Sequence, residues 1–191
     1  MKVIGINCSQ KVKDSTSGAL LKIALQKVES SGIETELINL ADYSLALCTG
    51  CDRCVTGDTC PLHDDFDPIC EKLLQADAVI FATPVYWGRY PSLFSCFVDR
   101  MRKFTKPPHP LLKKRVGLIV QSGITDNALT VGSFGQLFRS FGMINTISVG
   151  IGMMEYEKMP HDDENAVSLT QLVGERVVMS LHSEKIKKIF G

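Results

Sequence analysis

Residues 3–28, VIGINCSQKVKDSTSGALLKIALQKV, contain an apolar run, a polar turn and a helical pattern in succession. The run at 3–6 is β-branched and apolar without alternation, as expected for a strand buried on both faces. After the turn, apolar residues recur at i, i+3, i+4 and i+7 on a helix that is expected to stop near Gly32: these are Leu21, Ala24, Leu25 and Val28. This succession predicts a strand, a turn and a helix that crosses over to a parallel strand.

The same alternation continues to the end of the chain. Further strands are expected at 34–40, 78–82, 116–120 and 146–149. The apolar stripes of the other helices are Phe66, Ile69, Cys70, Leu73 and Leu74; Phe94, Phe97, Val98 and Met101; Phe134, Leu137, Phe138 and Phe141; and Leu169, Leu172, Val173 and Val177. Five strands alternating with five helices predict one α/β domain over residues 1–191, a doubly wound parallel sheet with helices on both faces.

Composition excludes several classes of protein. The 191 residues include 21 Lys and Arg against 21 Asp and Glu, so the formal net charge is zero and no basic surface for nucleic acid or membrane is expected. No apolar run approaches the roughly 20 residues that span a bilayer, and residues 1–5 lack a signal-peptide layout. Seven cysteines, an odd number without an export signal, predict a reducing, cytoplasmic location.

The turn after the first strand is a candidate phosphate site. Ligands of doubly wound sheets bind beyond the carboxyl ends of the strands, and the turn at 7–17 has neither a G-x-G-x-x-G nor a Walker A pattern. Hydroxyls, a lysine and the free N–H groups of a starting helix can instead bind one phosphate. The candidate residues are Ser9, Lys11, Ser15, Thr16 and Ser17. The alternative is an ordinary solvated turn in which Asp14 or Ser15 caps the helix.

Two further turns are expected at the same edge of the sheet. The aromatic turn after the third strand suits a flat ring system, and the turn after the fourth strand would supply another wall. The candidate residues are Pro84, Val85, Tyr86, Trp87 and Gly88, followed by Ser122 and Gly123. Together the three turns predict a site for flavin mononucleotide (FMN). The aromatic turn could equally pack on a neighbouring subunit, where aromatic residues are enriched.

From Met1 to at least Val149, the chain resembles the flavodoxin-like NADPH-dependent FMN reductase family. The family's P-V-Y-W-G signature is present at 84–88, and the following helix ends in Asp99-Arg100 as the family's does. Its G-S-x-R phosphate loop is altered, because Cys8 replaces glycine and Lys11 replaces arginine; lysine keeps the charge but loses the bidentate fork. The resemblance implies strand order 2-1-3-4-5, bound FMN, and a homodimer or homotetramer with the flavin near a subunit interface.

The longest irregular stretch, about residues 41–64, is called the cysteine loop below. A loop of this length in a compact domain is usually functional. It contains Cys48, Cys51, Cys54 and Cys60 in the pattern C-x2-C-x2-C-x5-C-P. Similar dense runs bind [4Fe–4S] clusters in bacterial ferredoxins, and in the resembling family this loop is similar to that of the iron-sulfur flavoproteins, whose cluster ligands the four cysteines match. A zinc site, a redox disulfide from one C-x-x-C pair and a loop without any cluster are the alternatives.

The remaining candidates have structural interpretations. Cys8, Cys70 and Cys96 are expected to pack as small apolar residues, although a helix N-terminus could lower the pKa of Cys8. His63 is expected to be a solvated loop residue and is an alternative metal ligand. Asp64-Asp65 is expected to cap the next helix.

These features predict an iron-sulfur flavoprotein that transfers electrons between a one-electron donor such as ferredoxin, a [4Fe–4S] cluster and FMN, with a small-molecule acceptor. One alternative is an NAD(P)H-dependent FMN or quinone reductase without a cluster, and another is a non-enzymatic flavin- or zinc-binding regulatory module. Residues 150–164 could cover the flavin, contact another subunit or form a lid; they include Met153, Met154, Tyr156 and Met159.

Overall fold

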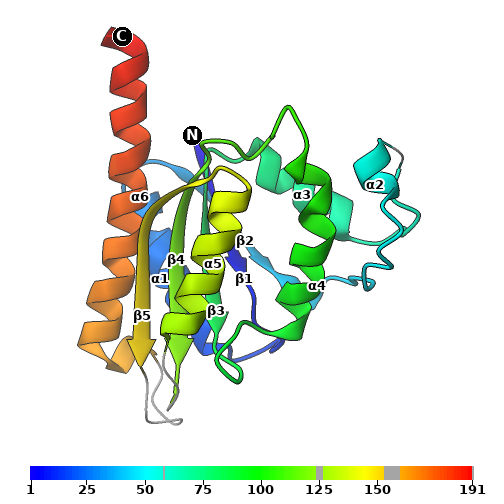
Figure 1. Cartoon of the computed structure of the whole chain (residues 1–191). Coiled ribbons are helices and arrows are strands. Elements are labelled where there is room, and N and C mark those ends of the chain that lie inside the picture. Colours follow the sequence, from blue (N-terminus) through cyan, green and yellow to red (C-terminus); the bar gives the residue numbers. More distant parts are fainter. Residues whose placement is uncertain (58, 124–126, 153–159, 191) are drawn as a thin grey trace.

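A computed structural model describes residues 1–57, 59–123, 127–152 and 160–190, without the side chains of 184–190. Five parallel strands form one sheet in the order β2-β1-β3-β4-β5 (Figure 1). They are β1 (Lys2–Asn7), β2 (Glu34–Asn39), β3 (Ala78–Pro84), β4 (Arg115–Ser122) and β5 (Ile144–Gly152). The predicted flavodoxin-like fold and its strand order are confirmed.

Helices cover both faces of this sheet (Figure 1). One face carries α1 (Thr16–Glu29) and α6 (Glu164–Phe190). The other carries α3 (Phe66–Gln75), α4 (Ser92–Arg100) and α5 (Ala128–Ser140). In the described parts of the connections there are three 3-10 turns: η1 (Leu40–Asp42), η2 (Met101–Thr105) and η3 (Pro160–Asp162).

Each face of the sheet has its own apolar core, because successive strand residues point to opposite sides. In β3, Val79 and Phe81 belong to the core under α3, α4 and α5, whereas Ile80 belongs to the core under α1 and α6. The Phe81 ring lies 5.8 Å from that of Phe134, centroid to centroid. The central strands β1, β3 and β4 are therefore almost wholly buried, as their apolar runs predict, whereas the edge strands β2 and β5 carry polar and exposed residues as well.

The helical stripes are buried as predicted, with small departures. In α3, Phe66, Ile69 and Leu73 are buried, but Leu74 is 37% exposed, because it lies about 100° further round the helix than Leu73. Met101 is buried, yet it begins η2 and not the last turn of α4.

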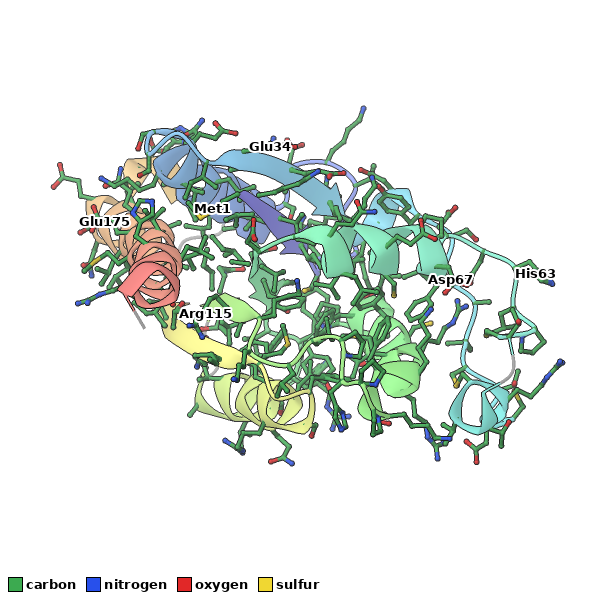
Figure 2. All side chains as sticks on the ribbon, turned by 90° about the horizontal axis from the view of Figure 1, so that it is seen from above. Met1, Glu34, His63, Asp67, Arg115 and Glu175 are labelled. Carbon is green, nitrogen blue, oxygen red and sulfur yellow. The ribbon has the colours of Figure 1, made fainter. Side chains whose placement is uncertain are left out.

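The cysteine loop is more structured than predicted, because it contains η1 and the short helix α2 (Arg53–Thr56). Gly57 ends α2 with φ of 103°, a left-handed conformation that glycine adopts without strain. Figures 1 and 2 show this loop standing away from the sheet, with His63 at its outer edge. Within the described ranges, no helix is long and apolar enough to cross a membrane.

Candidate functional site

The turn after β1 is organised by Asn7, a buried side chain that ends this strand. Its Oδ1 accepts hydrogen bonds from Ser17 Oγ at 2.9 Å and from the Ser9 backbone N–H at 3.2 Å. Its Nδ2 donates to Asn39 Oδ1 at 3.1 Å and to Ser15 Oγ at 3.4 Å. The amide therefore fixes three predicted phosphate-binding serines relative to the sheet. Asn7 was not among the predicted site residues. A polar residue at the end of an apolar strand is a sequence signal that could have identified it.

Ser15 caps α1 and belongs to the candidate site at the same time. Its Oγ accepts from the Gly18 N–H at 3.2 Å and lies 3.0 Å from Ser17 Oγ. The predicted capping role is confirmed. It does not exclude phosphate binding, because a helix N-terminus leaves several N–H groups without a partner inside the helix.

The turns after β1, β3 and β4 enclose a cavity of about 350 Å³, called the edge cavity below. Its lining comprises Ser9, Lys11, Ser15, Thr16, Ser17, Pro84, Val85, Tyr86, Gln121 and Gly123. Nine of the twelve predicted residues therefore come together. Of the other three, Ser122 is buried at the end of β4, and Trp87 and Gly88 are not among the lining residues.

Gln121 lines the edge cavity and was not predicted. It pairs in register with Pro84, and its carbonyl accepts from the Val85 N–H at 2.8 Å. This bond ties the aromatic turn to the end of β4. Only the pairing of β3 with β4 brings these two turns together.

The aromatic turn doubles back between Tyr86 and Arg89. The Tyr86 N–H donates to the Arg89 carbonyl at 2.8 Å, and Trp87 and Gly88 between them have φ of 54° and 75°. Trp87 lies at the tip of this turn and is 95% exposed. The chain by itself thus places Tyr86 at the cavity and turns Trp87 to solvent.

The edge cavity fits FMN. It has hydroxyls, a lysine and a helix N-terminus at the β1 turn, and apolar side chains at the β3 turn. Its volume lies at the lower end of the roughly 300–1,000 Å³ typical of ligand sites. A phosphate and a flat ring would each find matching chemistry in this lining.

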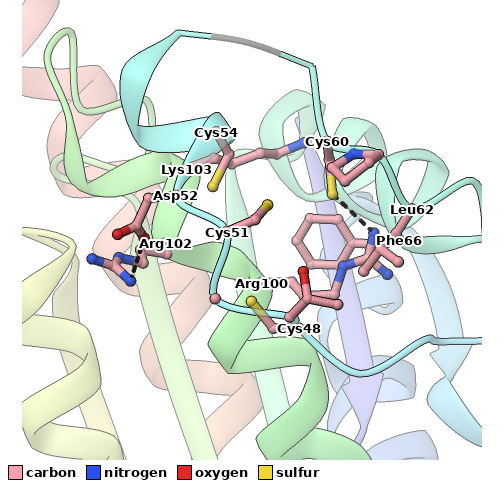
Figure 3. Close-up of a pocket in the computed structure, with 13 residues that line it drawn as sticks. Cys48, Cys51, Asp52, Cys54, Cys60, Leu62, Phe66, Arg100, Arg102 and Lys103 are labelled. Carbon is pink, nitrogen blue, oxygen red and sulfur yellow. Dashed lines mark hydrogen bonds and ion pairs between the residues drawn. The ribbon is translucent and has the colours of Figure 1, made fainter.

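The four cysteines of the loop line a second cavity, called the cysteine cavity below. Cys48, Cys51, Cys54 and Cys60 surround it, and Figure 3 shows their thiol groups arranged around a common space. All seven cysteines of the chain are free thiols, so no C-x-x-C pair is bonded. In the parts of the chain that the structure describes, no three His, Cys, Asp or Glu side chains form a ready site for a metal ion. His63 is exposed and is not among the residues lining this cavity.

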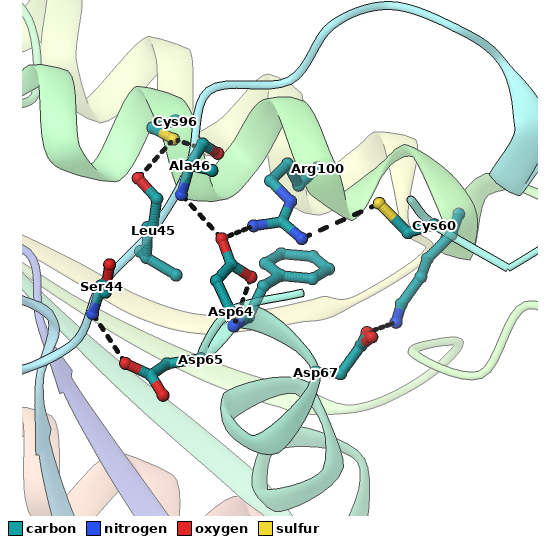
Figure 4. Close-up of polar contacts among 11 residues, drawn as sticks. Ser44, Leu45, Ala46, Cys60, Asp64, Asp65, Asp67, Cys96 and Arg100 are labelled. Atoms are coloured by element: carbon teal, nitrogen blue, oxygen red, sulfur yellow. Dashed lines mark hydrogen bonds and ion pairs between the residues drawn. The ribbon is translucent and has the colours of Figure 1, made fainter. Parts of the chain in front are cut away.

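The base of the cysteine loop is held by two consecutive carboxylates (Figure 4). Asp64 accepts from the Ala46 N–H at 2.7 Å and from the Phe66 N–H at 3.1 Å. Asp65 accepts from the Ser44 N–H at 2.7 Å and makes no side-chain capping bond to α3. Asp65 therefore occupies the predicted N-cap position without making a capping bond and closes the loop, while the preceding Asp64 accepts from the first N–H of the helix.

Cationic side chains line one side of the cysteine cavity. They are Arg100, Arg102 and Lys103, at the carboxyl end of α4 and in η2. The carboxyl end of a helix carries partial negative charge. Thiolates beside it would be repelled without such cations.

Arg100 is the buried member of this group, with 4% of its surface exposed. It forms an ion pair with Asp64, lies 4.3 Å above the Phe66 ring, and donates from Nη2 to Cys60 Sγ at 3.8 Å. Its buried Nε–H has no partner among the described residues. The three cations already pair with Asp64, Asp52 and Asp67. Four thiols beside the unused buried donor of Arg100 fit an anionic group with acceptor atoms, such as a thiolate-bound iron–sulfur cluster.

Four cysteines have shifted pKa values, and the shift of Cys51 is opposite to that of the three buried thiols. Burial raises the pKa of Cys8 and Cys96, and it raises the pKa of Cys70 to about 12. The predicted packing role of these three cysteines agrees with their burial, and the pKa of Cys8 lies above its ordinary value, not below it. Hydrogen bonds from the Arg53 backbone and the Thr49 side chain lower the pKa of Cys51. A lowered pKa favours Cys51 as a metal ligand over the three buried thiols, because thiolates bind metals.

Comparison with known proteins identifies the fold's relatives. Residues 1–153 match the NADPH-dependent FMN reductase family. An iron-sulfur flavoprotein of Methanocaldococcus jannaschii is 36% identical over 155 residues, which are 78% of this chain and 76% of that protein. One of Archaeoglobus fulgidus is 28% identical over 192 residues, covering 93% of this chain and 94% of that protein.

Solved structures share the architecture at low sequence identity. The protein RosB, solved with the bound intermediate 8-demethyl-8-formylriboflavin-5'-phosphate, superposes with a TM-score of 0.79 at 17% identity, covering 97% of this chain and 80% of that chain. At this identity the likeness concerns the fold alone. The family match, the fold and the edge cavity agree with one another, and the chain belongs to the NADPH-dependent FMN reductase family and is an FMN-dependent oxidoreductase.

Proposed function

We propose that the protein transfers electrons between a one-electron donor such as a ferredoxin-like carrier, a [4Fe–4S] cluster in the cysteine cavity and FMN in the edge cavity. The observation that carries the proposal is the convergence of Cys48, Cys51, Cys54 and Cys60 on one cavity lined by three cations. When bound, the cluster would supply one-electron exchange and FMN two-electron storage. A small-molecule acceptor would then receive the electrons.

The proposed FMN site combines the predicted residues with Gln121. Ser9, Lys11 and the hydroxyls of residues 15–17 would bind the phosphate, and Pro84, Val85 and Tyr86 would lie against the ring. Gly123 and Gln121 would form the third wall. Ser122 and Gly88 would shape the site through their backbone and the turn that they form. Trp87 would contact the ring or a second subunit.

The spacing of the four cysteines favours a cubane over zinc. A four-cysteine zinc site typically combines two C-x2–4-C pairs with a longer separation, whereas dense runs of cysteines bind [4Fe–4S] clusters in bacterial ferredoxins. Here all four cysteines lie within residues 48–60 and line one cavity. The cluster is therefore the proposed occupant.

The domain organisation, the oligomeric state and the cellular location are also proposed here. We propose that residues 1–191 form a single domain, since α1 and α6 pack in one apolar core. A homodimer or homotetramer is supported by the large apolar side chains exposed near the edge cavity, among them Trp87. A cytoplasmic location is supported by seven free thiols.

Anaerobic analysis of iron, labile sulfide and flavin tests the proposal. About four irons and four sulfides per chain are expected, together with one FMN. Cys51→Ala should abolish iron binding and leave FMN bound, because the two cavities use different turns. Cys70→Ala is the matched control: it removes a buried thiol outside the cysteine cavity and should keep the iron.

Each alternative predicts a different result. Yellow protein without iron or sulfide, bleached rapidly by NADPH, would identify a flavin reductase that uses NAD(P)H directly. Zinc without sulfide, in protein that stays colourless after FMN is supplied, would identify a regulatory module. Loss of flavin together with iron in Cys51→Ala would contradict the separation of the two sites.

A further inference from the structure

One face of α4 is turned toward the cysteine loop. Cys96 and Arg100 are four residues apart and therefore lie on the same side of this helix. Cys96 Sγ donates to the Ala46 carbonyl at 3.2 Å, and Arg100 pairs with Asp64. These contacts fix the base of the loop on the helix that follows the aromatic turn.

Asp64 joins the two ends of the loop that contains the cysteines. Its carboxylate accepts from the Ala46 N–H, and residues 47–63 between them include all four loop cysteines. Both Asp64 and Arg100 are buried, with 8% and 2% of their side chains exposed. A buried ion pair gains little over apolar packing of the same volume, so stability alone gives a weak reason for placing two charges here.

The guanidinium of Arg100 extends this contact to the cavity itself. Nη1 bonds Asp64, Nη2 donates to Cys60 Sγ at 3.8 Å, and Nε has no partner among the described residues. Arg102 lines the same cavity but differs in its environment. It pairs with Asp52 at 2.7 Å, and both of these side chains are about half exposed.

We propose that Arg100 is a positioning residue of the cysteine cavity: it holds Cys60 and, through Asp64, the base of the loop, and it sets the reduction potential of the iron–sulfur group bound there. The statement on the potential rests on the proposed function. The positioning of Cys60 and of the loop base depends only on contacts within this chain, and it can be tested without a metal.

The sign of the effect follows from charge. Reduction adds negative charge to a thiolate-bound cluster, and a cation that donates to a ligand sulfur stabilises this charge. Arg100 therefore raises the potential. A surface cation at a similar place contributes less, because solvent screens its charge.

The first test measures the midpoint potential by redox titration followed by electron paramagnetic resonance, on anaerobically reconstituted protein. Arg100→Gln should lower the potential by about 59 mV, a tenfold change for one electron. Arg102→Gln removes the same charge from the same cavity and should shift the potential less. Arg100→Lys should restore part of the shift, because lysine keeps the charge but cannot bridge two partners. Equal potentials for Arg100→Gln and Arg102→Gln would overturn the assignment.

The second test uses the metal-free full chain. Hydrogen exchange of the Ala46 amide should accelerate at least about tenfold in Arg100→Gln and Asp64→Asn, because the acceptor of this N–H is freed or weakened. Arg102→Gln should leave that rate unchanged. An unchanged rate in both of the first two variants would disprove the positioning role.

The two measurements separate the possible failures. Wild-type protein without iron but with the expected exchange pattern would contradict the proposed function and keep the positioning role. If Arg100→Gln does not fold, shown by loss of its far-ultraviolet circular dichroism, then Arg100→Lys and Asp64→Asn decide both measurements. A wild-type potential in a folded, iron-loaded Arg100→Lys and a wild-type exchange rate in Asp64→Asn would then overturn the proposal.

Discussion

Asn7 uses the whole hydrogen-bonding capacity of its side chain inside the protein. Two donors and two acceptor sites of the amide are each matched by a neighbour in the first turn or in β2. A buried amide left partly unpaired would cost about 1–3 kcal/mol. The turn around Asn7 is thus held in one conformation before any phosphate binds.

Lys11 is the cation of the proposed phosphate site. Lys11→Met should weaken FMN binding roughly tenfold, which corresponds to about 1.4 kcal/mol for a lost charge-assisted contact. Riboflavin lacks the phosphate, and its affinity should change little. Fluorescence titration of the flavin-free protein with both ligands measures this. Lys13→Met is the control, since Lys13 is exposed and does not line the edge cavity; equal losses for both variants would argue against a specific role of Lys11.

Thiol reactivity should follow burial and hydrogen bonding. In the metal-free chain near neutral pH, Cys51 should react with iodoacetamide well before Cys8, Cys70 and Cys96. Its pKa is lowered and theirs are raised, so its thiolate fraction is larger. Mass spectrometry after a short alkylation pulse gives the order. Modification of Cys70 as fast as Cys51 would show that the core opens under these conditions.

At the scale of elements, one close contact decides how the two helices on one face of the sheet pack together. Helix α6 approaches α1 at Gly174, where an added Cβ would lie 2.6 Å from the Ala24 carbonyl oxygen. On the other face, α4 begins after the aromatic turn and ends at the cysteine cavity. Helix α4 therefore runs from one proposed cofactor site to the other. Its nine residues give it a length of roughly 14 Å.

Gly174→Ala should destabilise the protein by about 1–2 kcal/mol, because the new methyl group forces α6 away from α1. Gly132→Ala is the matched control in α5, where an added Cβ meets no atom within 4 Å. This second variant should gain about 0.5–1 kcal/mol from helix propensity. Urea unfolding of both variants measures the difference. A stabilised Gly174→Ala would show that the two helices separate at little cost.

At the scale of the whole molecule, the apolar cores of the sheet do not depend on residues 47–62, the part of the cysteine loop that contains the four cysteines. The apolar core under α3, α4 and α5 draws on Leu40, Tyr43, Leu45 and Phe66, and residues 47–62 contribute no side chain to either core among those described. The edge cavity likewise uses no residue of the cysteine loop. Residues 47–62 are therefore an addition to a flavodoxin-like body that has its cores without them.

Replacing residues 47–62 with a short glycine-serine linker should therefore keep FMN affinity within about twofold, or ~0.4 kcal/mol. Iron binding should be lost completely. The linker is feasible because the Ala46 N–H already bonds the Asp64 side chain. Flavin titration and iron analysis of the excised protein measure both effects. Loss of flavin binding would show that the loop supports the edge cavity after all.

Much of the site was predictable from local patterns. The phosphate turn, the aromatic turn and the four cysteines each lie within one short segment, so residue types and spacing identify them. Local patterns do not identify the other site residues, because their partners lie 36 or more residues away in the sequence. Gln121 pairs with Pro84, and Arg100 pairs with Asp64. The exposure of Trp87 also depends on how its turn is placed. The predictions for Met153, Met154, Tyr156 and Met159 lie outside the described residues.

The sequence by itself determined the alternation of strands and helices, the two apolar faces of the sheet and the cysteine spacing, because burial of apolar side chains imposes the local periods of two and 3.6 residues. Only the tertiary structure decided that Asn7 organises the phosphate turn, that Gln121 closes the edge cavity, and that Arg100 joins Asp64 to Cys60. Those contacts arise from strand order and helix packing, which bring together residues that no local period relates.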